Sequence, residues 1–140
     1  MNEPSFVDFE TVIRLHRLAI VEFGGLDGIR DEDGLRGALG RPRTCYAYEC
    51  NPEEDSEGRV LALIAASYWV SIDNAQSFVK GNKRTALACF NEFLASNGLQ
   101  VNFSYEEIVD IKERVATKRL GRDDLATLIE PKLSAYQVDK

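Results

Sequence analysis

Hydrophobic residues recur with a helical period along most of the chain. Between Val7 and Phe23 they follow one another at steps of three or four residues, and His16 lies on the same face, which predicts an amphipathic helix. Further helices are expected at residues 31–40, 56–73, 82–96 and 105–118, with a last one over 125–133 that Pro131 limits or bends. Strand-rich patterns, repeats and linkers are not found. The pattern therefore predicts an all-α fold, one domain over residues 1–140 with about six helices.

Two of the expected helices are apolar on most sides. Val60 to Val70 runs almost without a polar residue, and Ala86 to Leu94 is nearly as apolar. Such helices belong at the centre of a bundle. The chain between them is polar, because residues 76–85 read Gln-Ser-Phe-Val-Lys-Gly-Asn-Lys-Arg-Thr. Two buried central helices should hold this stretch rigidly enough to form a site.

The first two helices have clear end signals. Gly24 and Gly25 end the first one, and we favour this interpretation over a phosphate-binding loop because no strand precedes the glycines. Asp31 is expected to cap the second helix, which Gly40 and Pro42 are expected to stop. The region from Arg41 to Glu57 keeps no period. We expect a loop there, with a short edge strand over residues 44–48 as the alternative.

Later helix ends are marked equally well. Asn97-Gly98 predicts a left-handed cap at the end of the second central helix. Ser104 and Glu107 have the spacing of a capping box, and Phe103 and Ile108 have that of a hydrophobic staple. A helix is therefore expected to begin at Tyr105.

Composition limits the possible functions. The chain has 140 residues, of which 44% are hydrophobic and 29% charged, as in an ordinary soluble globule. Its net charge of −6 argues against general nucleic-acid binding, because the phosphate backbone would be repelled. The N-terminus lacks the features of a signal peptide, and the apolar run at residues 60–70 is too short to span a bilayer. We therefore expect a cytoplasmic protein that binds neither nucleic acid nor membrane directly.

No metal site is expected. Cys45, Cys50 and Cys89 cannot all pair, and a zinc site would need more ligands than these and His16. We interpret the cysteines as ordinary thiols in a reducing compartment.

The polar stretch between the central helices has the features of an anion site. Gly81 permits a backbone conformation that side chains disfavour, and the amides of Asn82, Lys83 and Arg84 then open the next helix without intrahelical acceptors. Lys80 brings a third cation within five residues. Free amides, the positive helix end and three cations favour phosphate. The alternative is a solvated helix start with no ligand.

The same residues resemble the signature of the Fic/Doc family, His-x-Phe-x-Asp/Glu-Gly/Ala-Asn-Lys/Gly-Arg. Phe78 matches as the anchor of the motif, and the run from Gly81 to Ala86 matches with the Lys-Arg-Thr-Ala ending of the Doc branch. A second block, Phe23 to Asp31 continued by Gly34-Leu35 and residues 38–42, resembles the Doc-type N-terminal segment. The resemblance covers roughly residues 5 to 100 and implies the same all-α architecture.

The resemblance also implies a reaction. Fic enzymes usually transfer AMP from ATP to a protein hydroxyl group, and the Doc branch transfers the terminal phosphate. It further implies ATP or another nucleoside triphosphate as cofactor, a small antitoxin protein as partner and, if the chain is active, a protein target such as a translation factor. Glu53 to Glu57 or the tail after Pro131 could contact such an antitoxin.

Two residues depart from the motif. Gln76 stands at the position of the catalytic His and has no titratable group, so it cannot accept the hydroxyl proton. Lys80 stands at the position of the acid that holds Mg²⁺, and its charge would repel the ion, so a requirement for Mg²⁺ is doubtful. Phosphate binding is retained, and Lys80 could pair with a phosphate in place of the metal. His16 could be the missing base, but we favour a core histidine hydrogen-bonded to backbone.

Three explanations of Gln76 and Lys80 stay open. The chain could be a pseudoenzyme that keeps the pocket to bind a nucleotide or a partner. It could be an active transferase with altered chemistry, since phosphoryl transfer through a loose transition state needs little help from a base. The changes could also have been engineered to silence a toxic enzyme.

Overall fold

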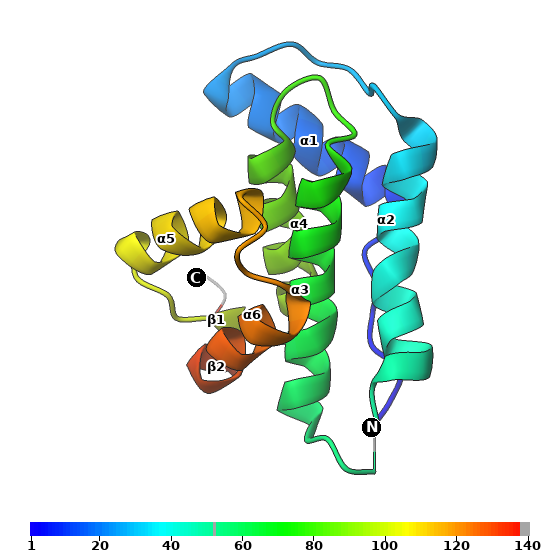
Figure 1. Ribbon diagram of the computed structural model, residues 1–140, viewed down its shortest axis with the longest axis vertical. Coiled ribbons are helices and arrows are strands. Elements are labelled where there is room, and N and C mark those ends of the chain that lie inside the picture. Colours follow the sequence, from blue (N-terminus) through cyan, green and yellow to red (C-terminus); the bar gives the residue numbers. More distant parts are fainter. Residues whose placement is uncertain (52, 138–140) are drawn as a thin grey trace.

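The computed structural model describes residues 1–51 and 53–137. Six α-helices make up most of this part of the chain: α1 (Phe9–Phe23), α2 (Glu32–Thr44), α3 (Glu57–Ala75), α4 (Asn82–Ser96), α5 (Tyr105–Ala116) and α6 (Arg122–Ile129). They are joined by a π-helical turn η1 (Cys45–Glu49), a 3₁₀ turn η2 (Glu130–Lys132) and the strands β1 (Leu99–Val101) and β2 (Leu133–Ala135). The expected all-α fold is confirmed (Figure 1).

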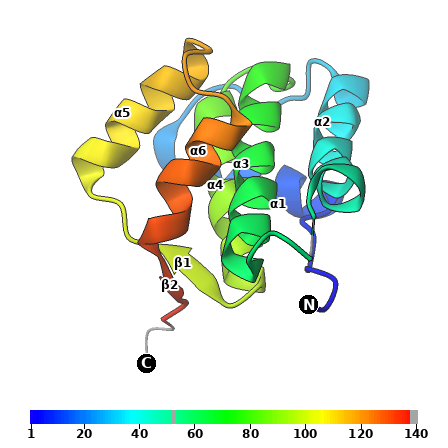
Figure 2. The same cartoon turned by 60° about the horizontal axis from the view of Figure 1, so that its bottom comes forward.

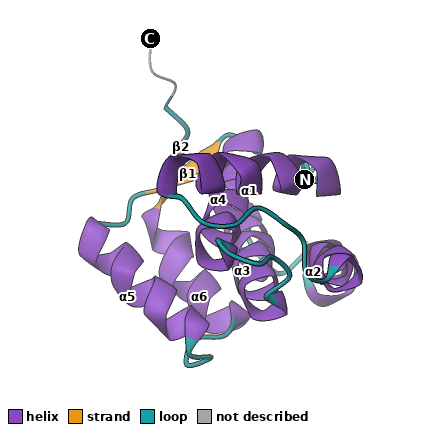
Figure 3. Ribbon diagram, turned by 90° about the horizontal axis from the view of Figure 1, so that it is seen from above, coloured by secondary structure: helices purple, strands orange, loops and turns teal. Residues whose placement is uncertain are grey.

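Helix α3 lies at the centre of the bundle. It contacts α2, α4, α5 and α6, and every residue from Val60 to Trp69 is buried. Seen from above, α2 lies on one side of α3 and α5 with α6 on the other (Figure 3). Helix α4 packs along α3 and also contacts α1. The two apolar helices predicted to be central are therefore the ones that carry the core.

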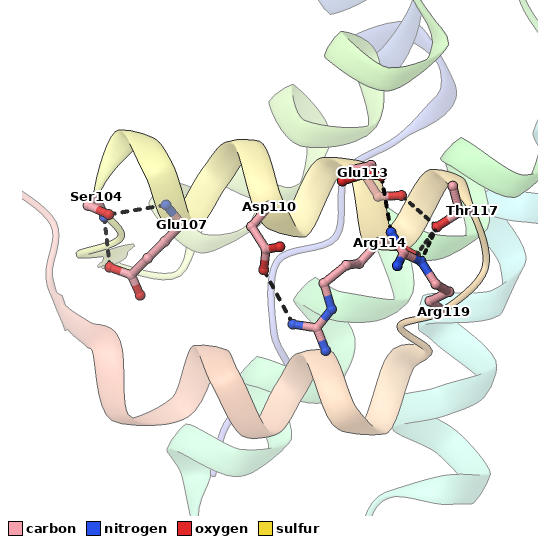
Figure 4. A network of polar contacts seen from close by, with 7 residues as sticks. All are labelled: Ser104, Glu107, Asp110, Glu113, Arg114, Thr117 and Arg119. Carbon is pink, nitrogen blue, oxygen red and sulfur yellow. Dashed lines mark hydrogen bonds and ion pairs between the residues drawn. The ribbon is translucent and has the colours of Figure 1, made fainter.

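Most of the predicted helix ends are confirmed. The carboxylate of Asp31 accepts the amide proton of Gly34, and Gly24 caps α1 with a φ of 82°. Ser104 and Glu107 form the expected reciprocal capping box at the start of α5 (Figure 4). Asp31 and Ser104 accept from amides that the start of a helix leaves free, whereas the Gly24 amide donates to the Ile20 carbonyl at the end of α1.

The predicted loop at residues 41–57 is wrong over its first half. Helix α2 continues through Pro42 to Thr44, and η1 follows, so residues 44–48 form neither a loop nor an edge strand. Leu35, Ala38, Leu39 and Pro42 are buried at helical spacing, so the proline ring extends the apolar face of α2. Its burial offsets the one hydrogen bond that proline cannot donate. The connection after η1 is irregular where it is described; Pro52 lies outside the described residues.

The end of the chain also differs from the expectation. Pro131 ends α6 as predicted, but Leu133 belongs to β2 rather than to a helix. β2 lies beside β1 and pairs with it antiparallel (Figure 2). In this pairing Gln100 lies opposite Ser134. Residues 133–135 are thus paired with β1, while Lys132 and residues 135–137 are exposed, so contact of this segment with an antitoxin stays a prediction. Residues 138–140 lie outside the described residues.

The cysteines are free thiols. The sulfur atoms of Cys45 and Cys50 lie 3.7 Å apart, and burial raises the pKa of Cys45 to about 12, which makes it a poor nucleophile. Within the described residues, no three metal-binding side chains gather in one place, and no helix is both long and apolar enough to cross a membrane.

Candidate functional site

The loop of residues 76–81 joins the two central helices through two left-handed residues. Gln76 ends α3 with φ 49° and ψ 43°, and Gly81 precedes α4 with φ 84°. A Cβ atom on Gly81 would lie 3.4 Å from Ile20 and 3.5 Å from the His16 ring, in addition to the strain of a positive φ. Glycine at position 81 lets the loop turn tightly against α1.

The first amides of α4 have no protein acceptor among the described residues. The first helical hydrogen bond is donated by Thr85 to the Gly81 carbonyl at 2.9 Å, and no side chain caps the helix. The N–H groups of Asn82, Lys83 and Arg84 are thus free, at the end of α4 where the helix dipole is positive.

A hollow of about 470 Å³ opens in front of these amides. Its lining residues are Gln76, Val79, Lys80, Gly81, Asn82, Lys83, Arg84 and Lys112. Four of them are cations, and none of the four forms an ion pair within the described part of the chain. No carboxylate is among the lining residues. The hollow therefore presents positive charge that no ion pair neutralises within the described residues, in a protein of net charge −6.

Lys112 was missed by sequence reasoning. It lies on α5, more than thirty residues after Gly81, and the packing of α5 against α3 brings it to the hollow. Neither a motif nor a local spacing connects Lys112 to the loop.

A second hollow of similar size, about 460 Å³, is electrostatically different. Arg122 lines it together with Glu49 and Asp123, and pairs with both carboxylates. This balance of charge favours the hollow beside α4 as the place for an anion.

The side chains of Gln76 and Asn82 hold the loop in shape. Asn82 accepts a hydrogen bond from the Phe78 amide at 2.9 Å and donates to the Phe78 carbonyl at 3.0 Å. The side-chain amide of Gln76 donates to the Asp73 carbonyl at 2.6 Å, and its oxygen lies 3.5 Å from the Asn82 nitrogen. Phe78 is fully buried, as expected of a motif anchor. Asn82 therefore offers the hollow its backbone amide, while its side chain is occupied.

The segment 24–31, called here the connector, supports the loop from the other side. The amides of Arg30 and Asp31 donate to the Ser77 carbonyl at 2.7 and 3.1 Å, and Val79 donates to Gly28 at 3.1 Å. The Arg30 guanidinium donates to the Gln76 carbonyl at 2.6 Å. The two matched sequence blocks are thus in direct contact, at the same end of the molecule (Figure 1).

Three polar groups lie buried beside the loop. The hydroxyls of Ser77 and Thr85 have no hydrogen-bond partner among the described residues. Asp73 is only 3% exposed; burial raises the pKa of its carboxyl, and the charge of Lys83 partly opposes that rise. Asp73 does not line the hollow, so it is not placed to hold a metal ion there.

His16 is a buried histidine bonded to backbone, as favoured from the sequence. Its Nε2 lies 2.7 Å from the carbonyl oxygen of Lys80, and its side chain is 2% exposed. Because His16 does not line the hollow, it is not positioned to act as the missing base.

Comparison with known proteins identifies the family of the chain. The model of the Fic/DOC family matches residues 6–94, a range that includes the connector and the loop. The chain is 33% identical over 117 residues to the protein kinase doc of Escherichia phage P1, covering 84% of this chain and 86% of that protein. It is 32% identical over 124 residues to the toxin Doc of Mycolicibacterium smegmatis, covering 86% and 88% respectively. The chain therefore belongs to the Fic/Doc family, in its Doc branch.

Proposed function

We propose that this protein is a Doc-type toxin that binds ATP or another nucleoside triphosphate in the hollow, through the phosphates. One observation carries the proposal: three free amides at the start of α4 face a hollow lined by four unpaired cations and no carboxylate. The names of the two relatives, a protein kinase and a toxin, support the same assignment.

The residues present fit a polyphosphate. Amides at a helix start donate to phosphate oxygens, and lysine and arginine form charge-assisted hydrogen bonds with them. Lys80, Lys83, Arg84 and Lys112 together can offset the charge of a triphosphate. The same residues do not fit Mg²⁺, which prefers carboxylate oxygens that the lining lacks. We therefore expect triphosphate binding that does not depend on Mg²⁺, with Lys80 supplying charge at the position of the metal.

Transfer to a protein hydroxyl, the family reaction, is expected to be impaired. Gln76 cannot take up a proton, and its side chain is already bonded to Asp73 and close to Asn82. Loss of a general base typically lowers the rate by about 10² to 10⁴. Residual transfer of phosphate or AMP would depend on positioning and charge alone.

A second candidate function is that of an inactive pseudoenzyme, a binding module for a nucleotide or an antitoxin. The bonded side chain of Gln76 favours it, because this residue serves the loop rather than a reaction. Val79 lines the hollow and is 41% exposed, and in the connector Ile29 and Leu26 are 40% and 67% exposed. Such apolar side chains next to a charged site are suited to a small partner protein.

Titration calorimetry with ATP, in the presence and absence of Mg²⁺, tests the binding proposal. We expect binding in both conditions. Absence of heat, together with an unchanged thermal midpoint for every triphosphate tried, would remove the basis of the assignment.

The two functions are separated by labelling. A cell lysate is incubated with ATP labelled at the α or the γ phosphate, using this protein or the double variant Gln76→His, Lys80→Asp. Label from γ indicates a kinase, and label from α indicates nucleotidyl transfer. Labelling by the double variant alone supports the pseudoenzyme, as does co-purification of a small partner with the unaltered chain.

A further inference from the structure

His16 makes three contacts around the loop. Its Nε2 lies 2.7 Å from the Lys80 carbonyl oxygen, and its ring stacks on Phe78 with centroids 3.9 Å apart and planes inclined by 9°. Its Nδ1 lies 3.6 Å from a carboxylate oxygen of Asp27 in the connector. Because a carbonyl oxygen can only accept, Nε2 carries the proton in this contact.

This hydrogen bond fixes the orientation of the Lys80–Gly81 peptide. In a trans peptide the C=O and N–H point in opposite directions, and the described residues contain no cis peptide bond. With the Lys80 carbonyl turned toward α1, the Gly81 amide must point away from α1. Gly81 lines the hollow, and its N–H has no protein acceptor in the described part of the chain.

The opposite orientation would be unfavourable for an anion. If this peptide were turned by half a rotation, the Lys80 carbonyl oxygen would take the place of the Gly81 N–H. The partial negative charge of that oxygen would then face the bound anion and repel it. Successive N–H groups around a left-handed residue form a concave anion site only when all point the same way. Close packing restricts the loop as well, since a Cβ on Gly25 would lie only 3.2 Å from the Cβ of Lys80.

We propose that His16 is a positioning residue of the anion site, which holds the Lys80–Gly81 peptide so that the Gly81 amide faces the hollow. Four successive amides, from Gly81 to Arg84, then face a bound phosphate group. The identity of the ligand rests on the proposed function, whereas the orientation of the peptide does not.

Three variants test this role. His16→Gln keeps an N–H donor at about the reach of Nε2, His16→Asn carries the same amide on a shorter side chain, and His16→Leu keeps the apolar volume without a donor. Affinity for inorganic pyrophosphate is measured by calorimetry, and the Gly81 amide is followed by NMR with and without pyrophosphate. The thermal midpoint of each variant shows that it is folded.

We expect His16→Leu and His16→Asn to lose about tenfold in affinity, the effect of one charge-assisted hydrogen bond. His16→Gln should stay within about threefold of the unaltered protein. The Gly81 amide resonance should shift on pyrophosphate addition in the unaltered protein and in His16→Gln only.

Equal affinity and an equal Gly81 shift in the folded Leu, Asn and Gln variants would overturn the role of His16. If the unaltered protein binds neither pyrophosphate nor any triphosphate tried, the proposed function fails instead. The positioning role is then decided without ligand, because a Gly81 amide resonance that is the same in the unaltered protein and in His16→Asn would contradict it.

Discussion

The guanidinium carbon of Arg84 lies 4.0 Å from the centre of the aromatic ring of Phe23, which is the last residue of α1. Phe23 belongs to the apolar face predicted for the first helix, but its side chain is 54% exposed and lies outside the core. The face of its ring carries partial negative charge and attracts a cation. Phe23 therefore holds Arg84 at the hollow.

Replacing Phe23 by leucine is expected to weaken ATP binding about two- to fivefold, which corresponds to the ~0.5–1 kcal/mol of an exposed cation–π contact. Titration calorimetry measures the change. Phe23→Tyr keeps the aromatic face and should bind as the unaltered protein does. Equal affinity for the leucine and tyrosine variants would show that Arg84 needs no support from α1.

Lys112→Ala is expected to lower triphosphate affinity about fivefold or more, and to make binding less sensitive to salt, because one cation leaves the hollow. Arg114→Ala is the matched control on the same helix, since Arg114 pairs with Asp110 on the surface (Figure 4). Both variants are compared by calorimetry at two salt concentrations. Equal losses of triphosphate affinity in Lys112→Ala and Arg114→Ala would indicate an effect of the net charge of the protein rather than of the hollow.

Tyr68→Phe is expected to destabilise the fold by about 1–3 kcal/mol, the cost of leaving buried backbone groups unpaired. The Tyr68 hydroxyl accepts from the Val7 amide at 2.8 Å and donates to the Val7 carbonyl at 3.3 Å. Chemical denaturation measures the loss of unfolding free energy. Tyr48→Phe, at a residue 84% exposed, should leave stability unchanged.

Tyr68 should also make the stability of the fold decrease with rising pH in the alkaline range. Burial raises the pKa of Tyr68 to about 12 from the ordinary 10.0. As the pH rises, the unfolded chain releases this proton first, so the contribution is complete below pH 10.0 and is lost between there and about 12. Denaturation midpoints across this range should fall less steeply for Tyr68→Phe. If the midpoints of the unaltered protein and of Tyr68→Phe fell in parallel with pH, this role of Tyr68 would be contradicted.

Ser104→Ala should cost about 0.5–2 kcal/mol by removing the capping box of α5. Ser104→Thr retains a hydroxyl and should lose little. Thermal unfolding followed by circular dichroism compares the two. If the alanine and threonine variants melt together, the capping box contributes nothing measurable to stability.

The elements that sequence reasoning predicted well are those set by neighbouring residues. Asp31 and Ser104 cap the helices that follow them, as the chain around each indicates. The free amides after Gly81 were also predictable, because a glycine turn before a helix leaves them without acceptors.

What could not be predicted depends on partners distant in the chain. Pro42 continues a helix because its ring is buried, which local rules for proline do not include. β1 and β2 are three residues each and pair across more than thirty residues, too short to show alternation. Lys112 and the connector reach the loop only through the packing of separate helices.

Because α3 is fixed at the centre of the bundle, the number of residues in this helix determines the direction in which the loop leaves it. Each residue of an α-helix turns the chain by about 100°, so one residue inserted between Trp69 and Gln76 would rotate the start of the loop by more than a quarter turn. Phe78 would then leave its place against His16, and the cations would face another part of the surface. In evolution, insertions and deletions in this stretch should therefore be far rarer than substitutions.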